Sequence, residues 1–171
     1  MIRPNLYKCS EQVGMVLSSH KLKLVTAESC TGGELAQYIT AVPGSSDWFE
    51  GGFVVYSNEA KHVLLGVDPQ LIEDHGAVSE QTVRAMTAGA LLRCTTADVA
   101  VAISGIAGPT GGTAEKPVGT VFLAWEWRDE IRGRRACRLQ LEGDRLTIRE
   151  QAVEAALRGL CESELPPEAT L

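Results

Sequence analysis

The sequence predicts a single-domain α/β protein, a layered α/β/α fold with a mixed, mostly parallel sheet. Stretches with apolar residues at helical spacing alternate with short β-rich runs along the chain. One of these runs, DVAVAI at 98–103, is almost continuously apolar, which is typical of a central strand covered on both faces. Residues 5–160 contain no internal repeat and no Pro/Gly/Ser-rich linker, so we expect one domain over 1–160 and a mobile tail over 161–171.

The first half of the chain predicts two helices and two strands. Thr31 and Glu34 have the spacing of a capping box, so a helix is expected to begin near Thr31. Gly51-Gly52 within a β-rich run predicts a bulge or the close approach of another backbone. In order, the expected elements are a helix over 6–17, a strand over 21–27, a helix from Thr31, a loop at 43–46 and a strand over 49–56.

The second half predicts four helices and three strands. Ser57 or Asn58 is expected to cap a first short helix, and Asp68-Pro69 to open a second one. The next elements are a helix over 79–94, strands over 98–103, 118–127 and 131–141, and a last helix over 144–160. A sheet of this kind places ligand sites at the carboxyl ends of its strands.

Composition and charge disfavour membrane and nucleic-acid partners. No run approaches the ~20 apolar residues of a bilayer span, and the N-terminus has no long apolar block of a secretory signal. The 16 Lys and Arg residues against 22 Asp and Glu residues give a net charge of −6, and the pI is 5.1. Because nucleic-acid affinity comes largely from neutralised phosphates, we expect a cytoplasmic protein that binds neither membranes nor nucleic acid.

Cysteine and histidine spacing predicts no metal site. The five cysteines form no CxxC pair and are odd in number, which disfavours a disulfide framework and a zinc knuckle. The three histidines have no HExxH or other close ligand spacing.

The segment AESCTGG at 27–33 is the first candidate for chemistry. A turn from a strand into a helix offers unpaired N–H groups and the positive end of the helix dipole, which suit a phosphate or a developing oxyanion. The segment is neither a Walker loop nor a GxSxG elbow, and simple capping by Ser29 or Thr31 is the alternative. Its three potential nucleophiles and two glycines are Ser29, Cys30, Thr31, Gly32 and Gly33.

The glycine-rich segment at 104–113, SGIAGPTGGT, is the second candidate. It follows the predicted central strand, and its backbone amides can converge on an anion, although an ordinary turn is the alternative. Arg145 at the start of the last helix is a further candidate for an anion, with plain surface charge as its alternative. The candidate ligand-binding residues of this loop are Ser104, Gly105, Gly111, Gly112 and Thr113.

A serine nucleophile needs a base, and several candidates remain open. A partly buried lysine can serve if its pKa falls from ~10.4 toward neutrality. Lys61 is such a candidate, and an exposed helix lysine is the alternative for this residue. His62 and His75 keep a serine–histidine pair open, and Cys30 keeps a thiol nucleophile open.

Taken together, these segments resemble the CinA C-terminal domain family, whose characterised enzymatic members are nicotinamide-nucleotide amidases. The resemblance spans roughly residues 10–158. It rests on AESCTGG at 27–33, PGSSDWFEGGFVVYSNEAK at 43–61, HGAVSEQTV at 75–83, SGIAGPTGG at 104–112, KPVGTV at 116–121 and GDR at 143–145.

The resemblance implies hydrolysis of the carboxamide of nicotinamide mononucleotide to nicotinate mononucleotide and ammonia, in pyridine-nucleotide salvage and without a cofactor. It implies Ser29 as the nucleophile and Lys61 as its general base, with Tyr56 orienting the lysine or relaying its proton. Amides of either glycine-containing segment would hold the oxyanion, and the remaining amides, with Thr113 or Arg145, would hold the 5′-phosphate. Because a lysine base must be uncharged and within reach, we expect Lys61 to be buried beside Ser29.

Two other functions remain open at this stage. One is a catalytically inactive nucleotide-binding paralogue with a regulatory or competence-associated role, and the other is a protein-interaction role in DNA uptake. Aromatic residues are enriched at interfaces, so strand positions that face outward would predict a homo-oligomer. The residues behind that expectation are Trp48, Phe49, Trp125 and Trp127.

Overall fold

The computed structural model describes residues 3–161 and confirms the predicted order of helices and strands. The first elements are α1 (Pro4–Ser19), β1 (Leu24–Glu28), α2 (Glu34–Thr40), a short 3-10 helix η1 (Ser45–Asp47), β2 (Phe49–Val54) and α3 (Asn58–Leu65). They are followed by α4 (Pro69–His75), α5 (Glu80–Arg93), β3 (Val99–Gly105), β4 (Thr120–Trp127), β5 (Arg134–Gln140) and α6 (Arg145–Cys161). The predicted tail lies, apart from Cys161, outside the described residues.

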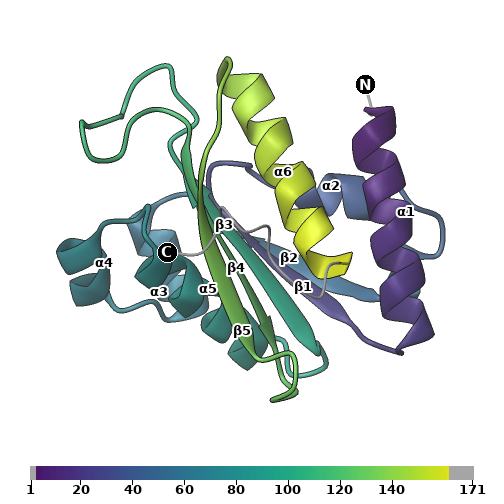
Figure 1. Ribbon diagram of the computed structural model, residues 1–171. Coiled ribbons are helices and arrows are strands. Elements are labelled where there is room, and N and C mark those ends of the chain that lie inside the picture. The colour runs from purple at the N-terminus through teal and green to yellow at the C-terminus, as the bar shows by residue number, and fades with distance from the viewer. Residues whose placement is uncertain (1–2, 162–171) are drawn as a thin grey trace.

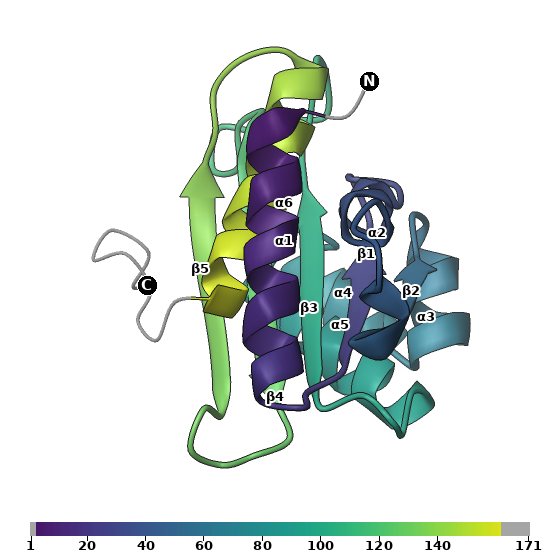
Figure 2. The ribbon, with the colours of Figure 1, turned by 90° about the vertical axis from the view of Figure 1, so that its right-hand side faces the viewer.

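The five strands form one mixed sheet in the order β2-β1-β3-β4-β5. β1 is parallel to both β2 and β3, whereas β4 is antiparallel to β3 and β5. Helices α1, α2 and α6 cover one face of the sheet, and α3, α4 and α5 cover the other (Figure 1; Figure 2). The predicted three-layer α/β/α domain is therefore confirmed.

The central strand β3 is buried on both faces, as its apolar run predicts. Val101 and Ile103 join the core beneath α1, α2 and α6, whereas Ala100 and Ala102 pack toward α5. The small side chains on the second face leave room for α5 to lie close to the sheet. The sheet therefore has one core on each side.

The tryptophans belong to the core. Trp48, Trp125 and Trp127 are all buried, and a Cβ atom on Gly159 of α6 would lie 2.2 Å from the Trp125 ring. Helix α6 can approach β4 this closely because residue 159 has no side chain. The expectation that these aromatic residues face outward is therefore wrong for the tryptophans.

Strand β2 contains the bulge that Gly51-Gly52 predicts. Phe49 pairs with Leu24 but Gly51 pairs with Val25, so one extra residue is accommodated. A Cβ atom on Gly52 would lie 2.4 Å from the Thr26 hydroxyl, so the close approach at this glycine is by a side chain and not by another backbone.

Three strands begin two or three residues later than predicted, and each has a turn residue with a positive φ shortly before it. Lys21 has a φ of 55°, Gly119 of 92° and Gly133 of 59°. The Gly133 amide also donates to the Asp129 carbonyl at 3.1 Å, which closes the β4–β5 turn. In the described part of the chain, no helix is long and apolar enough to cross a membrane.

Candidate active site

Ser29 lies immediately after β1, the strand between β2 and β3. Its amide donates to the Ile103 carbonyl at 3.0 Å, and its carbonyl accepts from the Gly32 amide at 3.0 Å. The side chain is 7% exposed. The nucleophile candidate therefore sits at the carboxyl end of a central strand, the place where sheets of this kind bind ligands.

Lys61 reaches Ser29 from α3, on the face of the sheet that α3, α4 and α5 cover (Figure 1). Ser57 caps α3 by accepting from the Ala60 amide at 3.0 Å, and the first turn of that helix turns Lys61 inward. The lysine is only 1% exposed, and its Nζ lies 3.0 Å from Ser29 Oγ. The predicted burial of Lys61 beside Ser29 is therefore confirmed.

The three hydrogen-bond partners of Lys61 Nζ are all uncharged oxygens. Besides Ser29 Oγ, the amine contacts the Val55 carbonyl at 2.9 Å and the Tyr56 carbonyl at 3.2 Å. Burial lowers the pKa of Lys61, because desolvation penalises its charged form, and Cys30 opposes the shift weakly. A neutral amine has two N–H groups for the two carbonyls and one lone pair, which is left for the Ser29 hydroxyl.

Tyr56 contacts Lys61 through its backbone and not through its phenol. Its side chain is 61% exposed, and its hydroxyl accepts a hydrogen bond from Arg145 Nη2 at 3.1 Å rather than touching the lysine. Only its main-chain carbonyl contacts Lys61. Tyr56 therefore orients Lys61 through the backbone, and a relay through the phenol has no contact to support it in this geometry.

The expected capping box of α2 is wrong. The residue before the helix is Gly33, with a φ of 94°, and within the described structure the buried Thr31 hydroxyl has no hydrogen-bond partner. The cap is the carboxylate of Glu28, which accepts from the amides of Gly33, Leu35 and Ala36 at 2.9 to 3.0 Å. These amides are consequently closed to an external anion.

Two amides of the nucleophile turn remain for a ligand. Within residues 3–161, the main-chain amides of Cys30 and Thr31 donate to no oxygen atom. Burial raises the pKa of the Cys30 thiol to about 11, which keeps it protonated at neutral pH. The geometry therefore favours the serine over the thiol as nucleophile.

Several residues of the glycine-rich segment at 104–113 contact other parts of the protein. The Ser104 hydroxyl donates to the Ala77 carbonyl at 2.7 Å, and the Thr113 hydroxyl accepts from the Lys116 amide at 3.0 Å. A Cβ atom on Gly105 would lie 2.6 Å from the Val121 side chain, and one on Gly112 would lie 2.6 Å from the backbone of residue 118. These four residues have structural partners, and Gly111, Gly112 and Thr113 are exposed. Contact of this loop with a ligand stays a prediction.

Arg145 joins the two loops that border the site. Its Nη1 donates to the Gly108 carbonyl at 2.7 Å, and its Nη2 donates to the Tyr56 hydroxyl. Tyr56 follows β2 and Gly108 follows β3, and β1 lies between these strands. The guanidinium therefore bridges the segments on either side of the strand that ends at Ser29.

The histidines do not take part in this arrangement. His62 Nδ1 is bonded to the Val67 carbonyl at 3.0 Å, and His75 is exposed at the last residue of α4. Among the described residues there is no cluster of three or more His, Cys, Asp or Glu side chains suited to a metal ion. Ser29 and Lys61 are thus the pair that the fold brings together.

Comparison with known proteins gives the family. A family model described as the CinA C-terminal domain matches residues 6–163. The chain belongs to this family. Nicotinamide-nucleotide amidohydrolase PncC of Escherichia coli (strain K12) is 51% identical over 161 residues, which cover 94% of this chain and 95% of that protein. A CinA-like protein of Akkermansia muciniphila is 51% identical over 148 residues, which cover 86% of this chain and 35% of that longer protein.

Solved structures agree with this membership. The crystal structure of the competence/damage inducible protein CihA from Agrobacterium tumefaciens superimposes with a TM-score of 0.88 at 40% identity, and the match covers 94% of this chain and 96% of that chain. A CinA superfamily protein from Klebsiella pneumoniae 700603 gives a TM-score of 0.86 at 37% identity, with 91% and 95% of the two chains covered.

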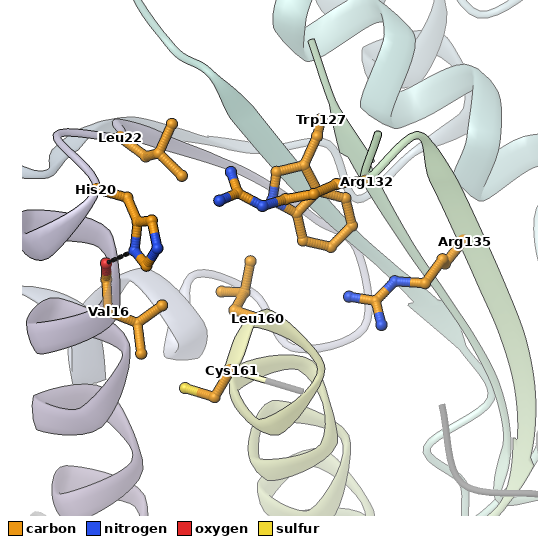
Figure 3. Close-up of a pocket in the computed structure, with 8 residues that line it drawn as sticks. All are labelled: Val16, His20, Leu22, Trp127, Arg132, Arg135, Leu160 and Cys161. Carbon is orange, nitrogen blue, oxygen red and sulfur yellow. Dashed lines mark hydrogen bonds between the residues drawn. The ribbon is translucent and has the colours of Figure 1, made fainter. Parts of the chain in front are cut away.

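A separate cavity of about 250 Å³ in this CinA C-terminal domain lies away from Ser29. It is enclosed by the C-terminal ends of α1 and α6 and by the β4–β5 hairpin, with Trp127, Arg132 and Arg135 projecting toward it (Figure 3). Leu22 precedes β1 and Trp127 ends β4, so the cavity is at the opposite end of the sheet. Arg135 stacks on the Trp127 ring at 4.6 Å and donates to the Gly159 carbonyl, which gives it a role within the fold.

Proposed function

We propose that this chain is an amidohydrolase that converts nicotinamide mononucleotide to nicotinate mononucleotide and ammonia. The observation that carries the proposal is the buried contact of 3.0 Å between Lys61 Nζ and Ser29 Oγ. The likeness to a nicotinamide-nucleotide amidohydrolase over nearly the whole of both chains supports the substrate.

Acylation begins with proton transfer from serine to lysine. Neutral Lys61 takes the proton of the Ser29 hydroxyl as Oγ attacks the carboxamide carbon, and a tetrahedral oxyanion forms. The amides of Cys30 and Thr31 are next to the nucleophile and donate to no oxygen atom within residues 3–161, and they are our candidates for the oxyanion hole. One such donor is typically worth ~10²-fold or more in rate.

The same lysine completes acylation and then assists deacylation. To complete acylation, the Lys61 ammonium gives its proton to the leaving nitrogen, the C–N bond breaks and ammonia departs, which leaves an ester between Ser29 and the nicotinoyl group. In deacylation, neutral Lys61 takes a proton from the water molecule that attacks this ester. The Lys61 ammonium then returns that proton to Ser29 Oγ as the ester bond breaks, and nicotinate mononucleotide is released. The carbonyls of Val55 and Tyr56 hold the amine in place through both steps.

We assign the 5′-phosphate to the side of the site formed by Arg145 and the glycine-rich loop. Glu28 occupies the N-terminal amides of α2, so the turn at 29–33 has no free helix end for a phosphate. Arg145 offers a planar guanidinium, which binds phosphate oxygens through two parallel hydrogen bonds. Exposed Gly111 lies in the same loop as Gly108, whose carbonyl Arg145 already contacts.

The test is ammonia release from nicotinamide mononucleotide by protein dialysed against a chelator. Ser29→Ala and Lys61→Ala should each lose roughly 10³-fold or more in kcat, while folding and nucleotide binding persist. Lys8→Ala, an exposed lysine on α1, is the control and should keep full activity. Activity that survives Ser29→Ala would overturn the mechanism, and a wild-type protein that binds the nucleotide without releasing ammonia would favour the inactive nucleotide-binding paralogue.

A further inference from the structure

Glu28 is a buried carboxylate at the junction between β1 and the nucleophile turn. Its main chain belongs to β1, where it pairs with Val54 on one side and Ile103 on the other. Its carbonyl also accepts from the Val55 amide at 2.8 Å. The side chain is 1% exposed, so its charge is held inside the protein.

The carboxylate connects the sheet to the start of α2. Oε2 accepts from the amides of Gly33 and Leu35 at 3.0 Å each, and Oε1 accepts from Ala36 at 2.9 Å. The positive end of the helix dipole and three N–H groups together compensate a buried negative charge. Residues 29–32 are consequently a short turn with both of its ends held by one residue. The main chain of Glu28 in β1 holds the first end, and its carboxylate holds the second.

A second contact holds the same turn from its carbonyl side. Arg149 on α6 donates from Nη2 to the Thr31 carbonyl at 2.7 Å and forms an ion pair with Glu34 at 3.2 Å. Glu28 fixes amides and Arg149 fixes a carbonyl, so the peptide groups of the turn have one defined orientation. In that orientation the Cys30 and Thr31 amides donate to no oxygen atom in the described part of the chain.

We propose that Glu28 is a positioning residue for the nucleophile. By holding the two ends of the turn, it keeps Ser29 Oγ against Lys61 Nζ and keeps the Cys30 and Thr31 amides available for the oxyanion. This role rests on the proposed serine–lysine chemistry. It assigns Glu28 no contact with the substrate, so loss of the carboxylate is expected to act on kcat rather than on substrate binding.

Glu28→Gln tests the role with almost no change in shape. The remaining oxygen can still accept from Gly33 and Leu35, but the new NH₂ group faces the Ala36 amide, and two donors cannot pair. The matched control is Glu126→Gln on β4. Glu126 is also a buried carboxylate, it accepts from the Thr87 hydroxyl at 2.8 Å, and it lies at the opposite end of the sheet.

The expected result is a selective loss of turnover. With nicotinamide mononucleotide, Glu28→Gln should lower kcat by ~10- to 100-fold with KM within about threefold of wild type, because a misplacement of ~1 Å costs about that much in rate. Glu126→Gln should keep the wild-type kcat, although its unfolding midpoint falls. A folded Glu28→Gln protein with wild-type kcat, or an equal loss of kcat in both variants, would overturn the proposal.

Two further measurements keep the result decisive. If Glu28→Gln does not fold, Glu28→Asp retains the charge but is shorter by one methylene group, and a kcat equal to wild type in that variant would also contradict positioning. The second is labelling by a fluorophosphonate, in which Ser29 Oγ bonds to phosphorus, fluoride leaves and Lys61 takes the hydroxyl proton. Labelling of Ser29 should be ~10-fold slower in Glu28→Gln than in Glu126→Gln.

The two readouts separate the two proposals. Slower labelling of Glu28→Gln in a protein that releases no ammonia would leave the positioning role standing and remove the proposed substrate. Equal ammonia release by wild type and Glu28→Gln would remove the positioning role and leave the proposed function standing.

Discussion

Lys61 carries an amine in a place where its charged form is poorly solvated. Its Nζ is surrounded by the Ser29 hydroxyl and two carbonyl oxygens, without a carboxylate among these partners. The Val55 and Tyr56 carbonyls bond equally well to a neutral amine, so they orient the group without requiring its charge. Burial then lowers the pKa of Lys61 and makes the free base available.

The lowered pKa of Lys61 predicts how stability depends on pH. Between that pKa and the ordinary value of 10.5, the unfolded chain holds a proton on Lys61 that the folded chain lacks. Unfolding therefore takes up a proton, and rising pH disfavours it. The free energy of unfolding of wild type minus that of Lys61→Met should rise by up to about 1.4 kcal/mol per pH unit in this window.

Urea unfolding at a series of pH values measures this difference. Lys61→Met provides the baseline for wild type, because the carbonyls of Val55 and Tyr56 that it leaves unpaired do not titrate. A difference that stays constant, or that falls as pH rises, would contradict the neutral lysine. The kcat/KM for amide hydrolysis should rise through the same lowered pKa and become flat above it.

At the level of residues, the sequence predicted the buried contact between Lys61 and Ser29 but not its support. Ser29 and Lys61 are recognisable from motifs, and a base must lie near its nucleophile. Glu28 escaped notice because its three partners lie five to eight residues away and converge only after the turn has formed. The contact of Tyr56 with Lys61 through its carbonyl rather than its phenol was not predictable, because a residue in a loop has no periodicity to indicate where its side chain points.

At the level of elements, caps formed by neighbouring residues were predictable. Ser57, Asp68 and Ser79 each accept from an amide two or three residues ahead, so a short sequence window contains the whole interaction. The cap of α2 was predicted wrongly, because it comes from Glu28 in the preceding strand. Helix starts that depend on tertiary contacts cannot be found from local spacing.

Helix α3 carries Lys61, and its position depends on a close contact with α5. A Cβ atom on Gly89 of α5 would lie 2.0 Å from the carbonyl oxygen of Leu65. In an exposed helix, Gly→Ala would stabilise by ~1 kcal/mol. Here we expect Gly89→Ala to destabilise the protein by about 1–3 kcal/mol or more, because the clash is with backbone.

The same substitution should lower activity, since displacement of α3 moves Lys61 away from Ser29. Denaturant unfolding and ammonia release measure the two effects. Leu92→Ala, on the exposed side of α5, is the control and should change the free energy of unfolding by no more than ~0.5 kcal/mol. A Gly89→Ala protein more stable than wild type would show that α3 can shift without cost.

At the level of the whole molecule, strand order assembles the site. Ser29, Tyr56 and Gly108 are far apart in sequence, and they meet because β1 lies between β2 and β3. The sequence predicted the α/β class and the use of the strand ends, but order within the sheet is a tertiary property. The homo-oligomer stays a prediction whose supporting tryptophans proved to be buried, and a monomeric mass by light scattering at micromolar protein would contradict it.

Arg145 tests whether this assembly recognises a phosphate. It crosses from the loop after β2 to the loop after β3, so a phosphate can replace the Tyr56 hydroxyl as its partner while the Gly108 carbonyl still holds it. Loss of a charge-assisted hydrogen bond is worth ~1.5–3 kcal/mol, so Arg145→Ala should raise KM for nicotinamide mononucleotide by roughly 10- to 100-fold.

The effect of Arg145→Ala on kcat separates binding from chemistry. Arg145 makes no hydrogen bond to the Lys61 amine. If it contributes equally to binding of the substrate and of the transition state, kcat should stay within about threefold of wild type. Arg145→Lys should restore only part of the affinity, since an ammonium cannot bond to Gly108 and a phosphate with the fixed geometry of a guanidinium. Wild-type protein should turn over free nicotinamide far more slowly than the nucleotide, because without the phosphate the Arg145 interaction is not gained. An unchanged KM in Arg145→Ala would place the phosphate elsewhere in the site.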